Sequence, residues 1–337
     1  MVWKMFLARV YLAITGIALC EGNIDPNTVL EELRDADRAF TQRCAISAKV
    51  ERPDKLHPVV IYRTHIARDA TRIAIHEDQF DYPLPPYYVP PKHSRSPLDH
   101  DPYGNYWLYQ RRETFSLVER QTVVEYEIVS LVSVTPSRTL VRPSGSLTHV
   151  LCIDEEKPRL TGYVRFRAEQ TLLASGRGFS RYIERAIEAK KLENGQILLR
   201  ARGVFNHAPG EWRLVIEPQH RYLVREAQFY ADAEPNTITE RWQMTGLQIA
   251  HGVPIAKYGS WKQSPGRGKE GEPLNWHHYE FLAFKPRFDE ELYALVRQRV
   301  FRPAHGAQVA DVRRNPPISF IYADSSESLA GVIEKKR

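Results

Sequence analysis

Residues 186–203 read AIEAKKLENGQILLRARG, and this stretch is the strongest indication of the fold. Two segments rich in strand-forming residues flank Asn194-Gly195. Asn-Gly favours a two-residue hairpin turn, because both turn positions need a positive φ that these residues tolerate. We therefore expect strands at Ala186–Leu192 and Gln196–Gly203, paired antiparallel.

The same pattern continues toward the C-terminus. Turn residues separate further expected strands at 211–217, 221–230, 237–244, 255–262 and 276–284. Short connections make consecutive strands antiparallel neighbours, so this region is predicted to be a meander. Trp212, Leu214 and Ile216 share one side of their strand, opposite Arg213 and Glu217, which indicates a sheet with one buried face.

The N-terminal half combines a helix with more strands. A helix is expected over 23–40, because Leu30, Leu33 and Phe40 recur at helical spacing after the start signal Asp25-Pro26. Strands are expected at 45–52, 59–67, 70–77, 106–119 and 122–134, and short helices at 179–184 and 288–300. The predicted fold class is mainly β (α+β): a large curved antiparallel sheet or half-barrel meander. Its N-terminal amphipathic helix and one or two short helices would form a lid.

The first twenty residues resemble an export signal. Lys4 and Arg9 provide a basic region, Val10–Leu19 is apolar, and small residues precede Glu21, where cleavage is expected. We predict an exported protein, periplasmic or extracellular, with lipid anchoring through Cys20 as a minor alternative. A buried N-terminal strand or helix is the other interpretation of this segment.

After the signal, one half-barrel-like domain is expected over 21–323. A Pro/Tyr-rich insertion at 81–102 carries seven prolines, and 324–337 is expected to be a flexible tail. Without the two basic residues of the signal, the formal net charge of +6 falls to +4, so no nucleic-acid partner is expected.

No motif predicts catalytic residues, a cofactor or a metal site. Gly266–Gly271 has the spacing G-x-G-x-x-G, but prolines flank it where a nucleotide fold needs a strand and a helix. His277 and His278 would point to opposite faces of a strand, so they would not bind one metal together. Cys44 and Cys152 remain after signal removal, and they either pair as a disulfide or stay as two buried thiols.

The element order, together with Leu192–Leu199 (LENGQILL) and Gly252–Lys257 (GVPIAK), resembles the LolA/LolB-type lipoprotein carriers of the bacterial envelope. The resemblance covers roughly residues 25–300. It implies an open curved sheet, lidded by helices, that holds acyl chains in an apolar cavity.

These observations favour a non-enzymatic envelope protein that binds an apolar ligand, a lipid or a lipoprotein in the concave face of its sheet. The expected lining residues and lid residues are apolar and share faces: Trp212, Leu214, Ile216, Trp242, Met244, Leu30, Leu33 and Phe40. A structural or protein-interaction role in the envelope is the alternative, with 81–102 as the contact, and a secreted hydrolase is a weaker one. Peripheral association with the envelope is compatible with both of the first two roles. The oligomeric state is left open.

Overall fold

The computed structural model describes residues 24–52, 60–80, 107–119, 122–135, 138–142, 149–154, 158–264, 275–303, 306–311, 318–322 and 332. The predicted signal 1–20, the insertion 81–102 and nearly all of the tail 324–337 lie outside these residues. The chain divides into two compact units, one of residues 1–39 and 173–276 and the other of residues 40–172 and 277–337. The single domain expected over 21–323 did not anticipate this division.

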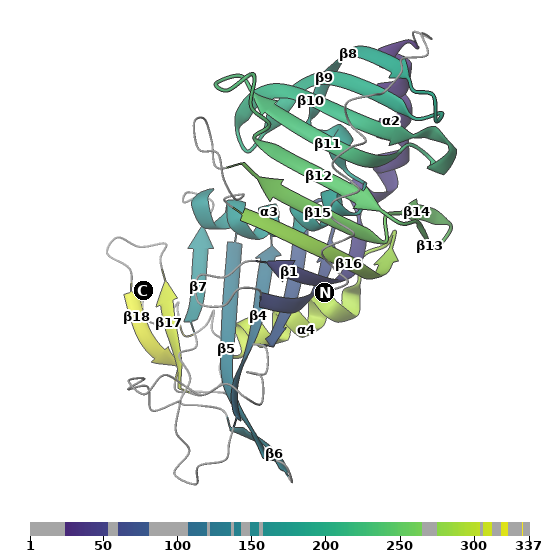
Figure 1. The fold of residues 1–337 in the computed structure, drawn as a ribbon. Coiled ribbons are helices and arrows are strands. Elements are labelled where there is room, and N and C mark those ends of the chain that lie inside the picture. The colour runs from purple at the N-terminus through teal and green to yellow at the C-terminus, as the bar shows by residue number, and fades with distance from the viewer. Residues whose placement is uncertain are drawn as a thin grey trace. The chain divides into compact units, whose positions relative to one another are not determined.

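Unit 1 is built on an antiparallel sheet with the strand order β15-β12-β11-β10-β9-β8 (Figure 1). The strands are β8 (Ile183–Lys191), β9 (Ile197–Phe205), β10 (Ala208–Glu217), β11 (Leu223–Ala231), β12 (Glu240–Thr245) and β15 (Tyr258–Gln263). A separate hairpin pairs β13 (Gln248–Ala250) with β14 (Val253–Ile255). The unit also contains most of helix α2 (Pro26–Gln42) and two short 3-10 helices, η1 (Phe179–Tyr182) and η2 (Pro218–His220).

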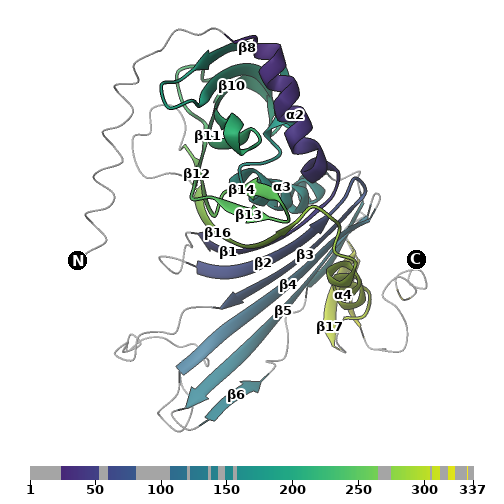
Figure 2. The same cartoon turned by 90° about the vertical axis from the view of Figure 1, so that its right-hand side faces the viewer.

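The sheet of unit 1 is apolar inside and charged outside. In Figure 2, β8, β10, β11 and β12 curl around the interior, and α2 runs alongside. Burial alternates strictly along β9 and along most of β10, as the sequence predicted. On the outer face, Arg200 lies between Glu188 and Glu211, with nitrogen–oxygen distances of 3.0 Å to each. The basic residues of these strands therefore form ion pairs within the sheet surface.

An irregular stretch of chain, the interior segment Leu173–Tyr182, lies against the inner face of this sheet. Two inward-facing glycines allow the close approach: a Cβ on Gly203 would lie 1.8 Å from the carbonyl oxygen of Tyr182, and one on Gly259 would lie 2.1 Å from that of Ala174. Backbone hydrogen bonds join the segment to β11, through Val224 N to Gly176 O (3.2 Å), and to the residue after β14, through Ala256 N to Ser175 O (3.0 Å).

Unit 2 is built on a second set of strands in the order β18-β17-β7-β5-β4-β3-β2-β1-β16, with β6 paired to β5. Its strands are β1 (Cys44–Arg52), β2 (Val60–Arg68), β3 (Arg72–Phe80), β4 (Trp107–Glu119), β5 (Thr122–Thr135), β6 (Arg138–Arg142), β7 (His149–Asp154), β16 (Asn275–Lys285), β17 (Ala307–Asp311) and β18 (Ile318–Tyr322). Pairing is antiparallel except between β17 and β7, which run parallel.

Two helices pack on unit 2 through different chemistry. Helix α4 (Glu290–Phe301) begins at Asp289, whose side chain accepts a hydrogen bond from Leu292 N at 3.0 Å, and it buries Val296 and Val300 in an apolar cluster. Helix α3 (Pro158–Ala174) instead sends Arg167 to the carboxylates of Glu77 (2.6 Å) and Glu125 (2.7 Å).

The predicted fold class is confirmed: the described residues are mainly β, with three α-helices and with strands that pair antiparallel except β7 and β17. Most expected strands and the helices at 23–40 and 288–300 match observed elements. Helix α3 was not predicted, and the helix expected at 179–184 is the 3-10 turn η1. In the described part of the chain, no helix combines the length and apolar character that crossing a membrane takes.

The strand order bears on the predicted alternatives for Cys44 and Cys152. Cys44 begins β1 and Cys152 lies in β7, and β2, β3, β4 and β5 lie between them. Neighbouring strands are about 4.8 Å apart, which places β1 and β7 roughly 24 Å apart along the sheet. A disulfide needs Cα atoms about 4.4–6.8 Å apart. The strand order thus gives the disulfide no support, and the two alternatives for these cysteines stay predictions.

Replacing Gly259 by alanine should destabilise unit 1. The added Cβ would overlap the backbone of Ala174, which has no rotamer to relieve the clash. We expect the free energy of unfolding to fall by about 1–3 kcal/mol, the usual range for overpacking. Urea unfolding followed by circular dichroism measures this, with Ser260→Ala on the opposite face as the matched control. Equal stability of the two variants would contradict the close approach.

Candidate ligand-binding site

Seven of the eight residues predicted to line a ligand site lie in unit 1, and all seven are buried. The exposed fraction is 0% for Leu33, Trp212, Leu214, Ile216 and Trp242, and 3% for Leu30 and Met244. The eighth, Phe40, belongs to unit 2 and packs edge-on against Phe284, with ring centroids 5.1 Å apart. The structure therefore brings the predicted lining residues of the sheet into the interior of unit 1, whereas Phe40 is counted in unit 2.

The centre of this interior is an aromatic cluster. Trp212 and Trp242 have ring centroids 5.6 Å apart, and Phe179 of the interior segment meets both edge-on, at 5.9 Å and 5.8 Å. Phe205 and Phe229, from β9 and β11, complete the cluster, at 5.5 Å and 4.9 Å from Trp212. Edge-to-face pairs at such distances are favourable beyond their burial. The sequence prediction missed these three phenylalanines as site residues.

Both tryptophans carry a buried polar atom that lacks a partner. Among the described residues, none accepts a hydrogen bond from the indole Nε1 of Trp212 or from that of Trp242. A buried donor without an acceptor costs about 1–3 kcal/mol, so most buried tryptophans find one. The interior of unit 1 thus combines an aromatic wall with two unused hydrogen-bond donors.

Trp261, on the neighbouring strand β15, has the opposite arrangement. Its indole Nε1 donates to a carboxyl oxygen of Glu240 at 2.6 Å, and the amide of Gln263 donates to the other oxygen at 3.2 Å. Burial raises the pKa of Glu240 to about 8, although these two hydrogen bonds oppose the rise. Glu240 is therefore mostly protonated at neutral pH, so the interior holds a neutral acid there.

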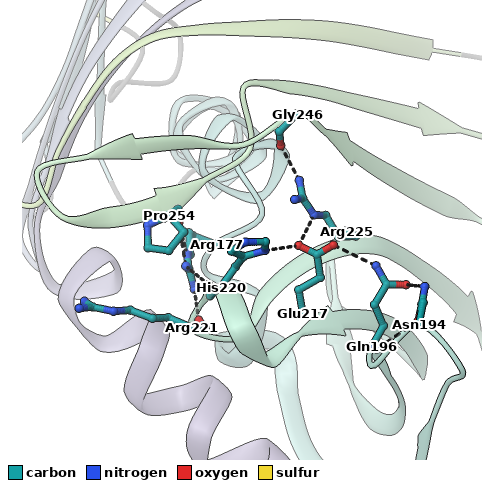
Figure 3. Close-up of polar contacts among 9 residues, drawn as sticks. All are labelled: Arg177, Asn194, Gln196, Glu217, His220, Arg221, Arg225, Gly246 and Pro254. Atoms are coloured by element: carbon teal, nitrogen blue, oxygen red, sulfur yellow. Dashed lines mark hydrogen bonds and ion pairs between the residues drawn. The ribbon is translucent and has the colours of Figure 1, made fainter.

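The interior segment is fastened by the buried guanidinium of Arg177 (Figure 3). Its Nε and Nη2 donate to the carbonyl oxygen of Pro254, at 3.0 and 2.7 Å. Nη1 donates to Arg221 O at 2.7 Å, and Nη2 also donates to His220 O at 3.1 Å. Burial lowers the pKa of Arg177 to about 10, partly offset by the negative charge of Asp37. One cation thus ties the segment to two connections of unit 1.

Asp37 of helix α2 holds the other end of the segment. Its carboxylate accepts a hydrogen bond from Ser180 N at 3.1 Å, and its side chain is almost fully buried. Burial raises the pKa of Asp37, while the backbone N–H groups of Gly178 and Ser180 and the charge of Arg177 act in the opposite direction. Helix α2 is also joined to the start of β8, because Arg34 donates to the carbonyl oxygen of Ile183 at 3.2 Å.

A second cluster of polar side chains surrounds Glu217 at the end of β10. Its carboxylate accepts hydrogen bonds from Arg225 Nε (2.7 Å) and Gln196 Nε2 (3.0 Å), and it lies 2.7 Å from His220 Nδ1 (Figure 3). Burial alone would raise the pKa of Glu217, but these hydrogen bonds together lower it. Arg225 also donates to Gly246 O at 2.5 Å, at the start of the β13–β14 hairpin.

Sequence reasoning missed Arg177, although a local signal was present. Ser175-Gly176-Arg177-Gly178 lies between a helix and a strand, and both glycines adopt positive φ, 83° and 89°. Glycines on both sides of an arginine indicate an unusual backbone path. What no pattern revealed is that three carbonyl groups far along the chain converge on this side chain.

This arrangement suits binding of a mostly apolar molecule with an oxygen acceptor. Ring faces and aliphatic side chains offer dispersion contacts, and the two indole N–H groups offer directional ones. The interior segment that occupies the concave face is held by Arg177 and Asp37 through hydrogen bonds. Exchanging such hydrogen bonds for hydrogen bonds to water costs less free energy than exposing a packed apolar core, because each contributes only about 0.5–1.5 kcal/mol net, or about 1.5–3 with a charged group.

Neither a family model nor a curated protein matches the sequence. Among solved structures, the chain is similar to a LolA superfamily protein from Nitrosomonas europaea, with 9% identity and a TM-score of 0.40 over 80% of this chain and 97% of that one. It is also similar to a DUF1329 family protein from Desulfovibrio piger, with 8% identity and a TM-score of 0.35 over 79% of this chain and 94% of that one. Both similarities concern the fold alone.

Replacing Glu240 by glutamine should remove a pH dependence of stability. Between about pH 4.3, the pKa of an unfolded glutamate, and its folded pKa of about 8, the folded protein keeps a proton that the unfolded chain has lost. Rising pH therefore destabilises the wild type in this window, by up to about 1.4 kcal/mol per pH unit, and the effect ends above the folded pKa.

We expect the stability of the Glu240→Gln variant, relative to wild type, to increase as the pH rises through this window, in urea titrations at several pH values. Glu211→Gln is the control, because hydrogen bonds from Arg200, the largest cause, and from Arg213 lower the pKa of Glu211. Parallel pH profiles of wild type and Glu240→Gln would contradict a protonated Glu240.

Replacing Arg177 by methionine should loosen the interior segment. The side-chain volume is largely kept, but three carbonyl groups lose their donor, and leaving buried acceptors unsatisfied costs about 1–3 kcal/mol each. We expect the free energy of unfolding to fall by about 3 kcal/mol or more, with faster amide hydrogen exchange concentrated in residues 174–182. The control Arg213→Met, on the outer face of the sheet, should change neither the free energy of unfolding nor the amide hydrogen exchange. Uniform exchange across unit 1 in Arg177→Met would argue against a local fastening.

Proposed function

We propose that this protein is a non-enzymatic, exported carrier that binds one apolar chain with an oxygen-containing head, such as a fatty acid or lipid acyl group. The ligand would lie on the concave face of unit 1, among Trp212, Leu214, Ile216, Trp242 and Met244. Helix α2, through Leu30 and Leu33, would act as the lid. The envelope location follows from the N-terminal segment and stays part of the proposal.

The observation that carries the proposal is the pair of buried indole N–H groups without an acceptor. An interior selected only for stability would gain from phenylalanine at Trp212 or Trp242, because an unsatisfied donor costs free energy. A ligand carbonyl or carboxylate oxygen would satisfy such a donor while its alkyl chain contacts the rings. Trp261, which donates to Glu240, needs no such ligand.

Binding requires the interior segment to give way, because Phe179 now packs against both tryptophans. The apolar ligand would replace the contacts of Phe179 with contacts of similar area, so the exchange costs little hydrophobic free energy. The hydrogen bonds of Arg177 and Asp37 would then set how readily the segment leaves. The polar groups around the apolar interior would thus control release of the segment, a role that they would not have in simple core packing.

The test is binding of cis-parinaric acid, a fluorescent fatty acid, to the purified protein. We expect saturable binding by wild type, and affinity lowered about 3–10-fold in Trp212→Phe and in Trp242→Phe, since each loses one hydrogen bond of about 0.5–1.5 kcal/mol. Trp261→Phe is the matched control, because its indole already has an acceptor within the protein.

Circular dichroism at the assay concentration shows that each variant is folded, so affinity is compared among folded proteins only. No saturable binding by wild type would reject the acyl ligand. Wild-type affinity in both Trp212→Phe and Trp242→Phe, with unchanged or increased stability, would assign the two tryptophans to the core alone.

A further inference from the structure

The β13–β14 hairpin of unit 1 and the residues on either side of it present apolar side chains to solvent. Leu247 is 41% exposed, Ile249 60% and Tyr258 42%. These are three of the seven large apolar residues exposed in the described part of the chain, and they lie within twelve consecutive residues. Single exposed apolar residues are ordinary on protein surfaces, whereas a group at one projecting element marks an interaction site.

The hairpin is held firmly in this position. Arg177 donates to Pro254 O in β14, and Arg225 donates to Gly246 O just before β13, as Figure 3 shows. The residues after β14 are anchored as well, because Ile255 and Ala256 are fully buried. The backbone that carries Leu247 and Ile249 is therefore fixed before any partner binds, so docking costs little conformational entropy.

The turn of the hairpin is shaped for a tight, projecting end. His251 and Gly252 both have positive φ, 50° and 76°, which is the backbone of a two-residue turn that follows the strand twist. Three residue pairs close the ladder, from Gln248 opposite Ile255 to Ala250 opposite Val253. Of the three exposed side chains, Ile249 lies on this short ribbon, Leu247 directly precedes it and Tyr258 begins β15.

Charge around the hairpin favours an anionic partner. Residues 241–264 contain Arg241, Lys257 and Lys262 and have no aspartate or glutamate. Arg241 is paired with Glu226 at 2.8 Å, but Lys257 and Lys262 are exposed, and the Lys257 ammonium lies 5.2 Å from the centre of the Tyr258 ring. Apolar tips beside lysines, with an aromatic ring between them, match the interface of a lipid bilayer.

We propose that the β13–β14 hairpin docks this protein on a membrane that contains anionic phospholipid. Leu247 and Ile249 enter the boundary between headgroups and acyl chains, Tyr258 lies at the headgroups, and Lys257 and Lys262 attract lipid phosphates. Apolar insertion and electrostatic attraction act together, because either one alone gives only weak, reversible binding. The docking surface is separate from the tryptophan interior, so this inference does not depend on the proposed acyl ligand.

The experiment is co-sedimentation of the protein with vesicles of phosphatidylcholine and phosphatidylglycerol in a ratio of about three to one, and with pure phosphatidylcholine vesicles. We expect wild type to bind the anionic vesicles, and more strongly than the neutral ones. The double variant Leu247→Asp/Ile249→Asp should lower the partition coefficient about tenfold or more, because it removes the inserted groups and adds repelled charges.

Ile187→Asp is the matched control, because Ile187 is also exposed (43%) in unit 1 but lies on β8. It should bind vesicles as wild type does. A thermal melt of each variant shows that it is folded, and uptake of cis-parinaric acid by the double variant should equal that of wild type.

The proposal is overturned if wild type does not sediment with anionic vesicles, or if the double variant binds them as well as wild type. Equal binding of wild type to the neutral vesicles would also overturn it, because the lysines would then contribute nothing. Loss of vesicle binding in Ile187→Asp would show general surface adhesion rather than docking by the hairpin.

Discussion

The irregular backbone inside the sheet of unit 1 must find hydrogen-bond partners away from water, and the arrangement of the unit depends on how it does so. Carbonyl groups of the interior segment Leu173–Tyr182 accept hydrogen bonds from β11 and from the residue after β14. In turn, the Arg177 side chain of this segment donates to three carbonyl groups elsewhere in unit 1. Inward-facing Gly203 and Gly259 leave room for the segment's own carbonyls. These hydrogen bonds offset the cost of burying polar backbone groups there.

The same interior contains two buried indole N–H groups, of Trp212 and Trp242, that have no acceptor among the described residues. Trp261 differs from them, because its indole has an acceptor. On β15 the indole has a partner in Glu240, an acid kept protonated by burial. On β10 and β12 the two indoles face only rings and aliphatic groups among the described residues. One sheet thus contains one buried indole that has an acceptor and two that have none among the described residues, and the proposed ligand site rests on the latter two.

How far the sequence predicted the fold depends on whether the pattern was local. The hairpin at Asn194-Gly195 and the alternation from Trp212 to Ile216 were predicted correctly, because both need only neighbouring residues. The two-residue turn was wrong in detail: Leu192 N donates to Gln196 O across a three-residue loop, in which Gly195 has positive φ and Asn194 does not. Helix α3 was missed: it buries Val164, Ala168 and Leu172 at helical spacing, but the same helix also carries Arg167, which pairs with Glu77 and Glu125 far along the chain. The hairpin strands β13 and β14 are three residues each, too short for any period to show.

By itself, the sequence determined the mainly antiparallel architecture, the inward face of the meander and the membership of Trp212 and Trp242 in it. Only the tertiary structure decided which strands lie between Cys44 and Cys152, that Phe40 packs in the other unit, and that Arg177 fastens the interior segment. The physical reason is the distance along the chain over which each effect acts. Strand alternation and turn chemistry act over a few residues, whereas strand order, the partner of a buried cation and the lack of an acceptor for an indole depend on residues distant in the chain.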